Sequence, residues 1–182
     1  MKKFKWFAMA LFAMTITSMT AQTEEEKELM ADAEKAKTTL IAENERIGDF
    51  FDSAYGYVIF PNVGKGGLII GGASGNGIVY QGGTSVGTAN LKKLNVGLQA
   101  GGQSVIEAIF FENETAFNEF KSDNYEFDAG ISAVVLKSGK ALKAKYEDGV
   151  AVFALPKAGL MADVTVGGQR FEFEAFETAS EK

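Results

Sequence analysis

A glycine-rich stretch with one lysine is the clearest candidate for chemistry in this sequence. It reads FPNVGKGGLIIGGASGNG from Phe60 to Gly77, and seven of its eighteen residues are glycine. Glycine-rich loops with a lysine bind phosphates in P-loop proteins, and glycine-rich turns bind dinucleotides in Rossmann folds. Lys65 is followed by glycine rather than by Ser or Thr, so the P-loop spacing fails. Ile69 stands where the dinucleotide fingerprint needs its third glycine, so the sequence predicts neither nucleotide site.

The same glycines have a structural explanation. Glycine within strands marks bulges, bends and close approaches of the backbone, and curved sheets use glycine kinks to turn. Gly71, Gly72, Gly75 and Gly77 belong to the stretch itself, and further glycine pairs follow at 82–83 and 101–102. We therefore predict that these glycines shape the backbone of a bent sheet.

Two residue types that are central to catalysis are missing from the sequence. There is no cysteine, which excludes disulfides, thiolate zinc sites and a cysteine nucleophile. There is no histidine, the commonest general base and metal ligand. Asp123, Glu126 and Asp128 are clustered, but around a predicted turn, where acidic residues are common. We expect a protein that is not an enzyme and has no metal or cofactor, with a carboxylate-dependent hydrolase as a minor alternative.

The N-terminal segment reads MKKFKWFAMALFAMTITSMTAQ and has the features of a secretory signal peptide. Three lysines precede an uncharged apolar run, and small residues before Gln22 offer a cleavage site. The alternative is a retained membrane anchor, although an uncharged run of 18 residues is at the short end for crossing a bilayer. We expect an exported protein, periplasmic or extracellular, either free or peripheral on the envelope membrane.

The charge of the remaining chain argues against one class of partner. Without residues 1–21, the sequence holds 15 basic and 24 acidic residues, a net charge of −9. An acidic chain is a poor partner for polyanions, so we expect no binding to nucleic acid.

The sequence after the N-terminal segment begins with a helical pattern. Thr23 and Glu26 have the spacing of a capping box, and the acids at 24–26 suit the positive end of a helix. We predict an amphipathic helix that ends at Gly48, and a short turn capped by Asp49 after it. The apolar residues at helical spacing are Leu29, Ala33, Ala36, Leu40 and Ile47.

The rest of the chain alternates between short apolar runs and turn residues. YGYVIFP, GGLIIGGA and IVYQ are predicted strands, with SGNG (Ser74 to Gly77) as a hairpin turn before the last of them. TANLKKLN is a predicted polar loop, and ETAFNEFK is a predicted short helix capped by Asn113. Further strands are predicted in LNVGLQAGGQ, SVIEAIFF, AGISAVVLK, KALKAKY, GVAVFALP, GLMADVTV and QRFEFEAF.

Eight or nine short strands and two helices, without regular strand–helix alternation, predict an α+β fold. We expect a single domain with a mainly antiparallel, curled or barrel-like sheet, an N-terminal amphipathic helix and a short second helix. The expected organisation is a signal peptide at 1–21, a helical lead-in at 22–54, a β-rich domain at 55–177 and a tail at 178–182.

The segment YGYVIFPNVGKGGLIIGGASGNGIVY resembles the central signature of the SYLF domain, a family of lipid-binding domains. That signature is an apolar strand into F-P-x-x-x-K-x-G, then a hydrophobic run, then G-G-x-x-G-x-G. The segments LNVGLQAGGQSVIEAIFFENETAFNEF, FDAGISAVV and KAGLMADVTVGG resemble the family in the same order, and KTTLIAENERIGDFFDSA resembles its helical lead-in. The resemblance covers residues 33–170, with Asp163 at a position where the family more usually has a small or apolar residue.

The resemblance implies a non-enzymatic protein of the bacterial cell envelope that binds lipid or a membrane surface. Eukaryotic members of the family bind phosphoinositide membranes, and fungal members also bind actin, which an exported bacterial protein does not meet. We therefore expect a phospholipid or a membrane surface as the partner. The alternative is a structural or protein-partner module of the envelope without a specific lipid ligand.

Lysines near the motif are the candidate contacts for anionic headgroups, each contributing up to about 1 kcal/mol. Within the motif this is Lys65 with its neighbours Gly66 and Gly67, and in the predicted polar loop Lys92 and Lys93. A second group lies around one predicted hairpin, where ordinary solvated lysines are the favoured alternative. This group comprises Lys137, Lys140, Lys143 and Lys145.

Overall fold

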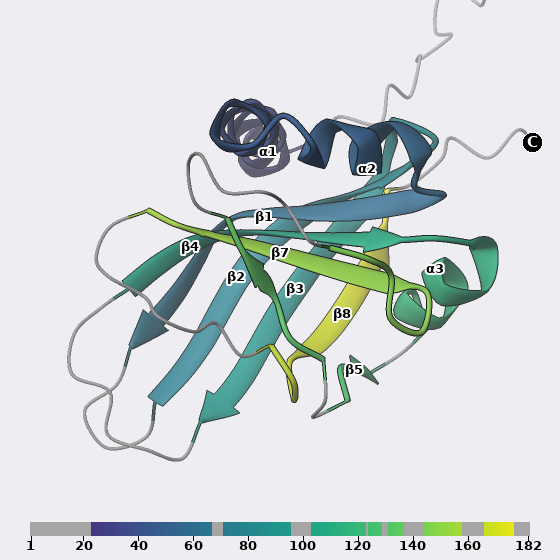
Figure 1. Cartoon of the computed structure of the whole chain (residues 1–182). Helices are drawn as coiled ribbons and strands as arrows, with labels where there is room; N and C mark the ends of the chain where they lie inside the picture. Colours follow the sequence, from purple (N-terminus) through teal and green to yellow (C-terminus); the bar gives the residue numbers. More distant parts are fainter. Residues whose placement is uncertain are drawn as a thin grey trace, which may run out of the picture.

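The computed structural model describes residues 23–66, 71–95, 103–122, 124–128, 131–136, 144–157 and 166–176. Within these residues, one eight-stranded sheet is curled into a half-barrel and three helices pack against it (Figure 1). The expected α+β class is confirmed, with a single domain, a mainly antiparallel curled sheet and an N-terminal helix.

The helices are α1 (Glu24–Glu43), α2 (Ile47–Ser53) and α3 (Glu114–Phe120). Across the sheet the strand order is β5-β8-β3-β2-β1-β4-β7-β6, and all pairs are antiparallel except the parallel pair of β6 and β7. The strand bounds are β1 Gly56–Gly66, β2 Gly71–Gln81, β3 Thr84–Asn95, β4 Gln103–Phe111, β5 Tyr125–Glu126, β6 Val134–Val135, β7 Val150–Pro156 and β8 Arg170–Ala175.

Helix α1 begins with the predicted capping box and ends earlier than predicted. The Thr23 hydroxyl accepts a hydrogen bond from the Glu26 amide at 3.2 Å, and the Glu26 carboxylate accepts one from the Thr23 amide at 2.7 Å. The helix stops at Asn44, whose side chain accepts a hydrogen bond from the Arg46 amide at 3.2 Å. Because this local bond competes with the helical ladder, α1 ends before Gly48, which lies instead in the first turn of α2.

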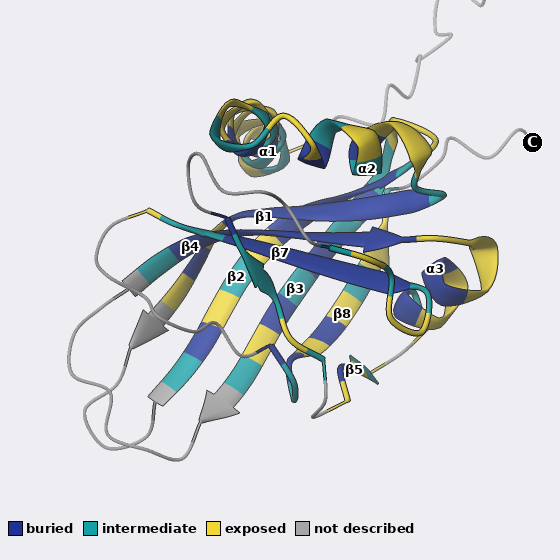
Figure 2. Ribbon diagram, in the orientation of Figure 1, coloured by how far each residue is buried: buried dark blue, intermediate teal, exposed yellow. Residues whose placement is uncertain are grey.

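Strands β1, β4 and β7 are buried on both faces of the sheet over most of their length (Figure 2). We call the face that carries α1 and α2 the outer face, and the face that carries α3 the inner face. Along β1, Tyr57 and Ile59 pack with Leu40 of α1 on the outer face, whereas Val58 and Phe60 pack with the inner-face core. A strand buried on both sides loses the simple alternation of apolar and polar residues, which explains the continuous apolar run YVIF.

A β-bulge interrupts β1 at its proline. Between Ile59 and Gly64, β1 has four residues where β2 has three, and between Phe60 and Val63 it has two where β4 has one. Pro61 lies within this bulge, which is one of the few places where a central strand tolerates a residue without an amide hydrogen.

Two glycines of the motif face the bulge from β2. A Cβ atom at Gly75 would lie 2.8 Å from the Asn62 carbonyl oxygen, and one at Gly77 would lie 2.7 Å from the Ile59 carbonyl oxygen. The SGNG segment is therefore not the hairpin turn that we predicted. It lies inside β2, where glycine is needed for the close approach of β1.

The turn between β2 and β3 is formed by Gly82 and Gly83, which we predicted as a kink. Both have positive φ, at 55° and 79°, as a two-residue hairpin requires. The turn at Asp148 and Gly149 is of the same kind, with φ of 49° and 78°. The pair at 101–102 lies outside the described residues.

Other expectations have mixed outcomes. Asn113 caps α3 as predicted, and QRFEFEAF contains strand β8, in which Phe171 is buried and Glu172 is exposed. The segment TANLKKLN is not a loop but the last two thirds of β3, because it pairs with β2 over its whole length and with β8 over Thr88 to Lys92. The described part of KALKAKY, residues 144–146, is not in a strand.

We predict that Gly77→Ala destabilises the fold by about 1–3 kcal/mol, because the new methyl group would press on the backbone of β1. Chemical denaturation of the purified protein measures this loss. Gly48→Ala is the matched control, since no atom lies within 4 Å of a Cβ built there, and it should leave stability unchanged or slightly higher. Equal stability of the Gly77→Ala variant and the wild type would contradict the close approach of β1 and β2.

Candidate functional site

Two of the candidate lysines, Lys65 near the end of β1 and Lys93 near the end of β3, lie at the same level of the sheet. In the pairing register, Lys65 of β1 is opposite Ala73 of β2, and Ala73 is opposite Lys93 of β3. Two strand spacings separate the backbones of Lys65 and Lys93, which is roughly 10 Å. Gly66 is the last residue of β1 and pairs with Gly72, whereas Gly67 lies outside the described residues.

The two neighbouring lysines of β3 face opposite sides of the sheet. Lys92 is exposed on the outer face, where its ammonium group lies 3.0 Å from the Glu172 carboxylate of β8. Lys93 shares the inner face with Leu91, which is fully buried. The predicted pair of headgroup contacts is therefore divided, with only Lys93 on the inner face.

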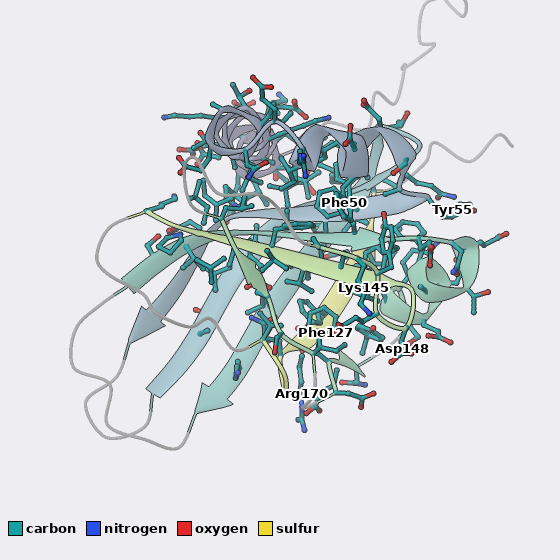
Figure 3. The ribbon with its side chains drawn as sticks, in the orientation of Figure 1. Phe50, Tyr55, Phe127, Lys145, Asp148 and Arg170 are labelled. Carbon is teal, nitrogen blue, oxygen red and sulfur yellow. The ribbon has the colours of Figure 1, made fainter. Side chains whose placement is uncertain are left out.

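A buried carboxylate and a buried amide lie on the inner face. Glu107 of β4 and Gln169, in the turn before β8, are both 0% exposed. The Gln169 Nε2 group donates a hydrogen bond to Glu107 Oε2 at 3.1 Å. The backbone of Gln169 is fixed by Phe127, whose amide donates a hydrogen bond to the Gln169 carbonyl at 2.9 Å. Figure 3 labels Phe127 beside the turn that precedes β8. Burial of a carboxylate is costly, so this hydrogen bond compensates part of the lost hydration.

Glu107 and Lys93 interact electrostatically across the curved inner face of the sheet. Burial lowers the pKa of Lys93, and the nearby charge of Glu107 partly opposes this shift. Strands β2 and β1 separate β3 from β4, so the interaction depends on the curvature of the half-barrel. The inner face thus holds an electrostatically linked group, which we call the Lys93 cluster: Lys93, Glu107 and Gln169.

Glu107 and Gln169 were not among the site residues predicted from the sequence. Glu107 is the single charged residue in the apolar run SVIEAIFF, and an acid inside a strand that is buried on both faces is the signal that identifies it. Gln169 gives no such signal, because its position depends on the turn that Val166 and Gln169 close by a 3.0 Å backbone hydrogen bond.

The other candidate residues do not join this group. Lys145 and Glu112 line a hollow near Phe111, the end of β4 that lies opposite to Gln103. Figure 3 shows Lys145 far from the ends of β1 and β3. The three other lysines of that hairpin, at 137, 140 and 143, lie outside the described residues, as do Asp123 and Asp163. Glu126 is paired with Arg170 at 2.8 Å.

The described residues contain no group of three or more acidic side chains placed to hold a metal ion. Among the helices described, none combines the length and the apolar character needed to cross a bilayer.

We predict that Glu107→Gln lowers the pKa of Lys93, because the carboxylate charge favours the ammonium form of the lysine. An NMR titration of the Lys93 side chain measures this shift. Glu172→Gln is the matched control on the outer face and should leave the pKa of Lys93 unchanged. A Lys93 pKa that stays constant or rises in Glu107→Gln would show that the two groups are not linked.

Comparison with known proteins gives one named relative and no family assignment. No family model matches the chain. The chain is 30% identical over 123 residues to beta cell expansion factor A from Aeromonas veronii. The alignment covers 66% of this chain and 46% of that protein, so the chain spans about half the length of this relative.

Proposed function

We propose that this protein is a non-enzymatic lipid-binding protein of the bacterial cell envelope that contacts membrane surfaces through one end of its sheet. The observation that supports this proposal is the register that brings Lys65 of β1 and Lys93 of β3 to the same level of the sheet, on either side of β2. We define the strand-end surface by the residues that close this end: Lys65, Gly66, Gly72, Lys93 and Gln103.

Positive charge at the strand-end surface suits anionic headgroups. A lysine close to an anionic membrane contributes about 1 kcal/mol to binding. Lys93 is partly desolvated, as its lowered pKa reflects, so its ammonium group has lost some of its interaction with water. An anionic headgroup would replace that interaction.

The sequences that follow these strand ends are apolar. β1 continues into Gly67-Leu68-Ile69-Ile70 before β2, and β3 continues into VGLQAGG before β4. Apolar side chains beside basic residues are the composition of surfaces that lie at the boundary of headgroups and acyl chains. This sequence pattern therefore supports a membrane contact at the same end as the two lysines.

The resemblance to the SYLF domain supports the same proposal. Its signature spans β1 and β2, and includes Lys65, the bulge at Pro61 and the glycines that face the bulge. We propose that the chain is an exported member of this family, guided to the envelope by residues 1–21. The relationship to beta cell expansion factor A adds a named relative, whose name specifies no ligand.

We predict that Lys93→Gln weakens binding to vesicles of phosphatidylethanolamine and phosphatidylglycerol by about five-fold, the equivalent of about 1 kcal/mol. Co-sedimentation at low and at moderate salt measures the loss, and the effect should shrink as salt rises. Lys92→Gln is the matched control, because the adjacent side chain lies on the opposite face and is paired with Glu172. It should bind as the wild type does.

Two results would contradict this proposal. Failure of the wild-type protein to bind the vesicles at either salt concentration would remove lipid binding, and equal losses in Lys93→Gln and Lys92→Gln would remove the strand-end surface as the contact. A thermal melt of each variant checks that the fold is retained.

A protein-partner role is the second candidate, and the outer edge of β8 favours it. Within the described residues, β5 pairs only with Arg170 and Phe171, so the backbone edge of β8 from Glu172 to Ala175 is open. Open strand edges accept strands from partners. Capture of an envelope protein that survives delipidation, together with no binding to vesicles, would favour this role.

A further inference from the structure

A groove on the outer face has an apolar floor. It lies between α1 and the bulge of β1, the start of β4 and the end of β7, and has a volume of about 450 Å³, within the range of ligand sites. Pro61 and Ile106 form its buried floor, and Leu155 and Pro156 of β7 extend that floor toward solvent. We call this feature the α1 groove.

The bulge in β1 explains why this floor is apolar. Pro61 reaches the groove from the bulged segment and has no amide hydrogen that would need a partner there. The neighbouring Asn62 is exposed, and its side chain is hydrogen-bonded to the Ser104 hydroxyl. The floor thus offers carbon surface rather than backbone polar groups.

The rim of the α1 groove carries charges of both signs. Asp32, Lys35 and Glu43 line it from one face of α1, at spacings of three and eight residues, and Lys157 lines it from the end of β7. No described residue forms an ion pair with any of these four side chains. The rim therefore presents two ammonium groups and two carboxylates that are available to a ligand.

This combination matches an amphiphile whose head carries both charges. An acyl chain would cover the apolar floor, a phosphate would lie by Lys35 and Lys157, and an ammonium group would lie by Asp32, one helical turn from Lys35. A fatty acid or a purely anionic lipid would place its charge by Lys35 but would bring no cation to Asp32.

We propose that the α1 groove binds one molecule of a zwitterionic phospholipid. This inference deepens the proposed lipid binding, on which it rests, and adds a defined site for a single lipid on the face opposite to the Lys93 cluster. The strand-end surface would then contact the membrane while the groove holds one lipid from it.

The test uses a single-chain zwitterionic lipid, lysophosphatidylcholine, below the concentration at which it forms micelles. Isothermal titration calorimetry with the purified protein should show one site per chain. Lys35→Ala combined with Lys157→Ala should weaken binding about ten-fold, as expected when hydrogen bonds to a charged phosphate are lost. Asp32→Asn should weaken the binding of lysophosphatidylcholine and leave the binding of lysophosphatidylglycerol unchanged or tighter.

Lys27→Ala is the control on α1, since Lys27 does not line the groove and pairs with Glu24 at 2.8 Å. Absence of lysophosphatidylcholine binding by the wild type would overturn the inference. Equal losses in Lys27→Ala and the groove variants, or tighter binding of a fatty acid of the same chain length, would also overturn it. Vesicle binding that depends on Lys93 and persists without lysophosphatidylcholine binding would defeat only the groove, and the reverse pattern would defeat only the strand-end surface.

Discussion

The bulge at Pro61 in the central strand is the constraint on which the rest of the sheet depends. β1 is paired along both edges and buried on both faces, so an extra residue in it must be accommodated by each neighbour. β2 accommodates it with Gly75 and Gly77, where a Cβ atom would meet the β1 backbone at 2.8 and 2.7 Å. The local bend that a bulge introduces contributes to the curl of the half-barrel. The glycine motif is therefore a packing requirement in β2, whatever its neighbouring lysine contacts.

The curl has a chemical consequence on the inner face. It brings the charge of Glu107 to Lys93 although two strands lie between them. It also closes the inner core over Glu107, so that the carboxylate takes a hydrogen bond from Gln169 instead of water. Lys92, the next residue of β3, has none of these interactions because alternation places it on the outer face beside Glu172. Two adjacent lysines thus have different environments and different proposed roles.

The features that were predictable from the sequence are those set by neighbouring residues. The capping box of Thr23 and Glu26 depends on a spacing of three, and the structure shows both of its hydrogen bonds. The SGNG segment misled us because Asn-Gly is a local turn signal, whereas its true position is fixed by pairing with a bulged strand. Glu107 was detectable as an acid in an apolar run. Its contact with Gln169, 62 residues away, was not detectable, because it depends on the curvature of the whole sheet.

Hydrogen exchange measured by mass spectrometry, with and without vesicles that contain phosphatidylglycerol, tests the central claim most directly. The account predicts that vesicles slow exchange in peptides at the strand-end surface, around Lys65 and Lys93. Exchange in α3, at the opposite end of β4, should be unchanged. Absence of any change, or protection confined to α3 and the Asp148–Gly149 turn, would contradict a membrane contact through this end of the sheet.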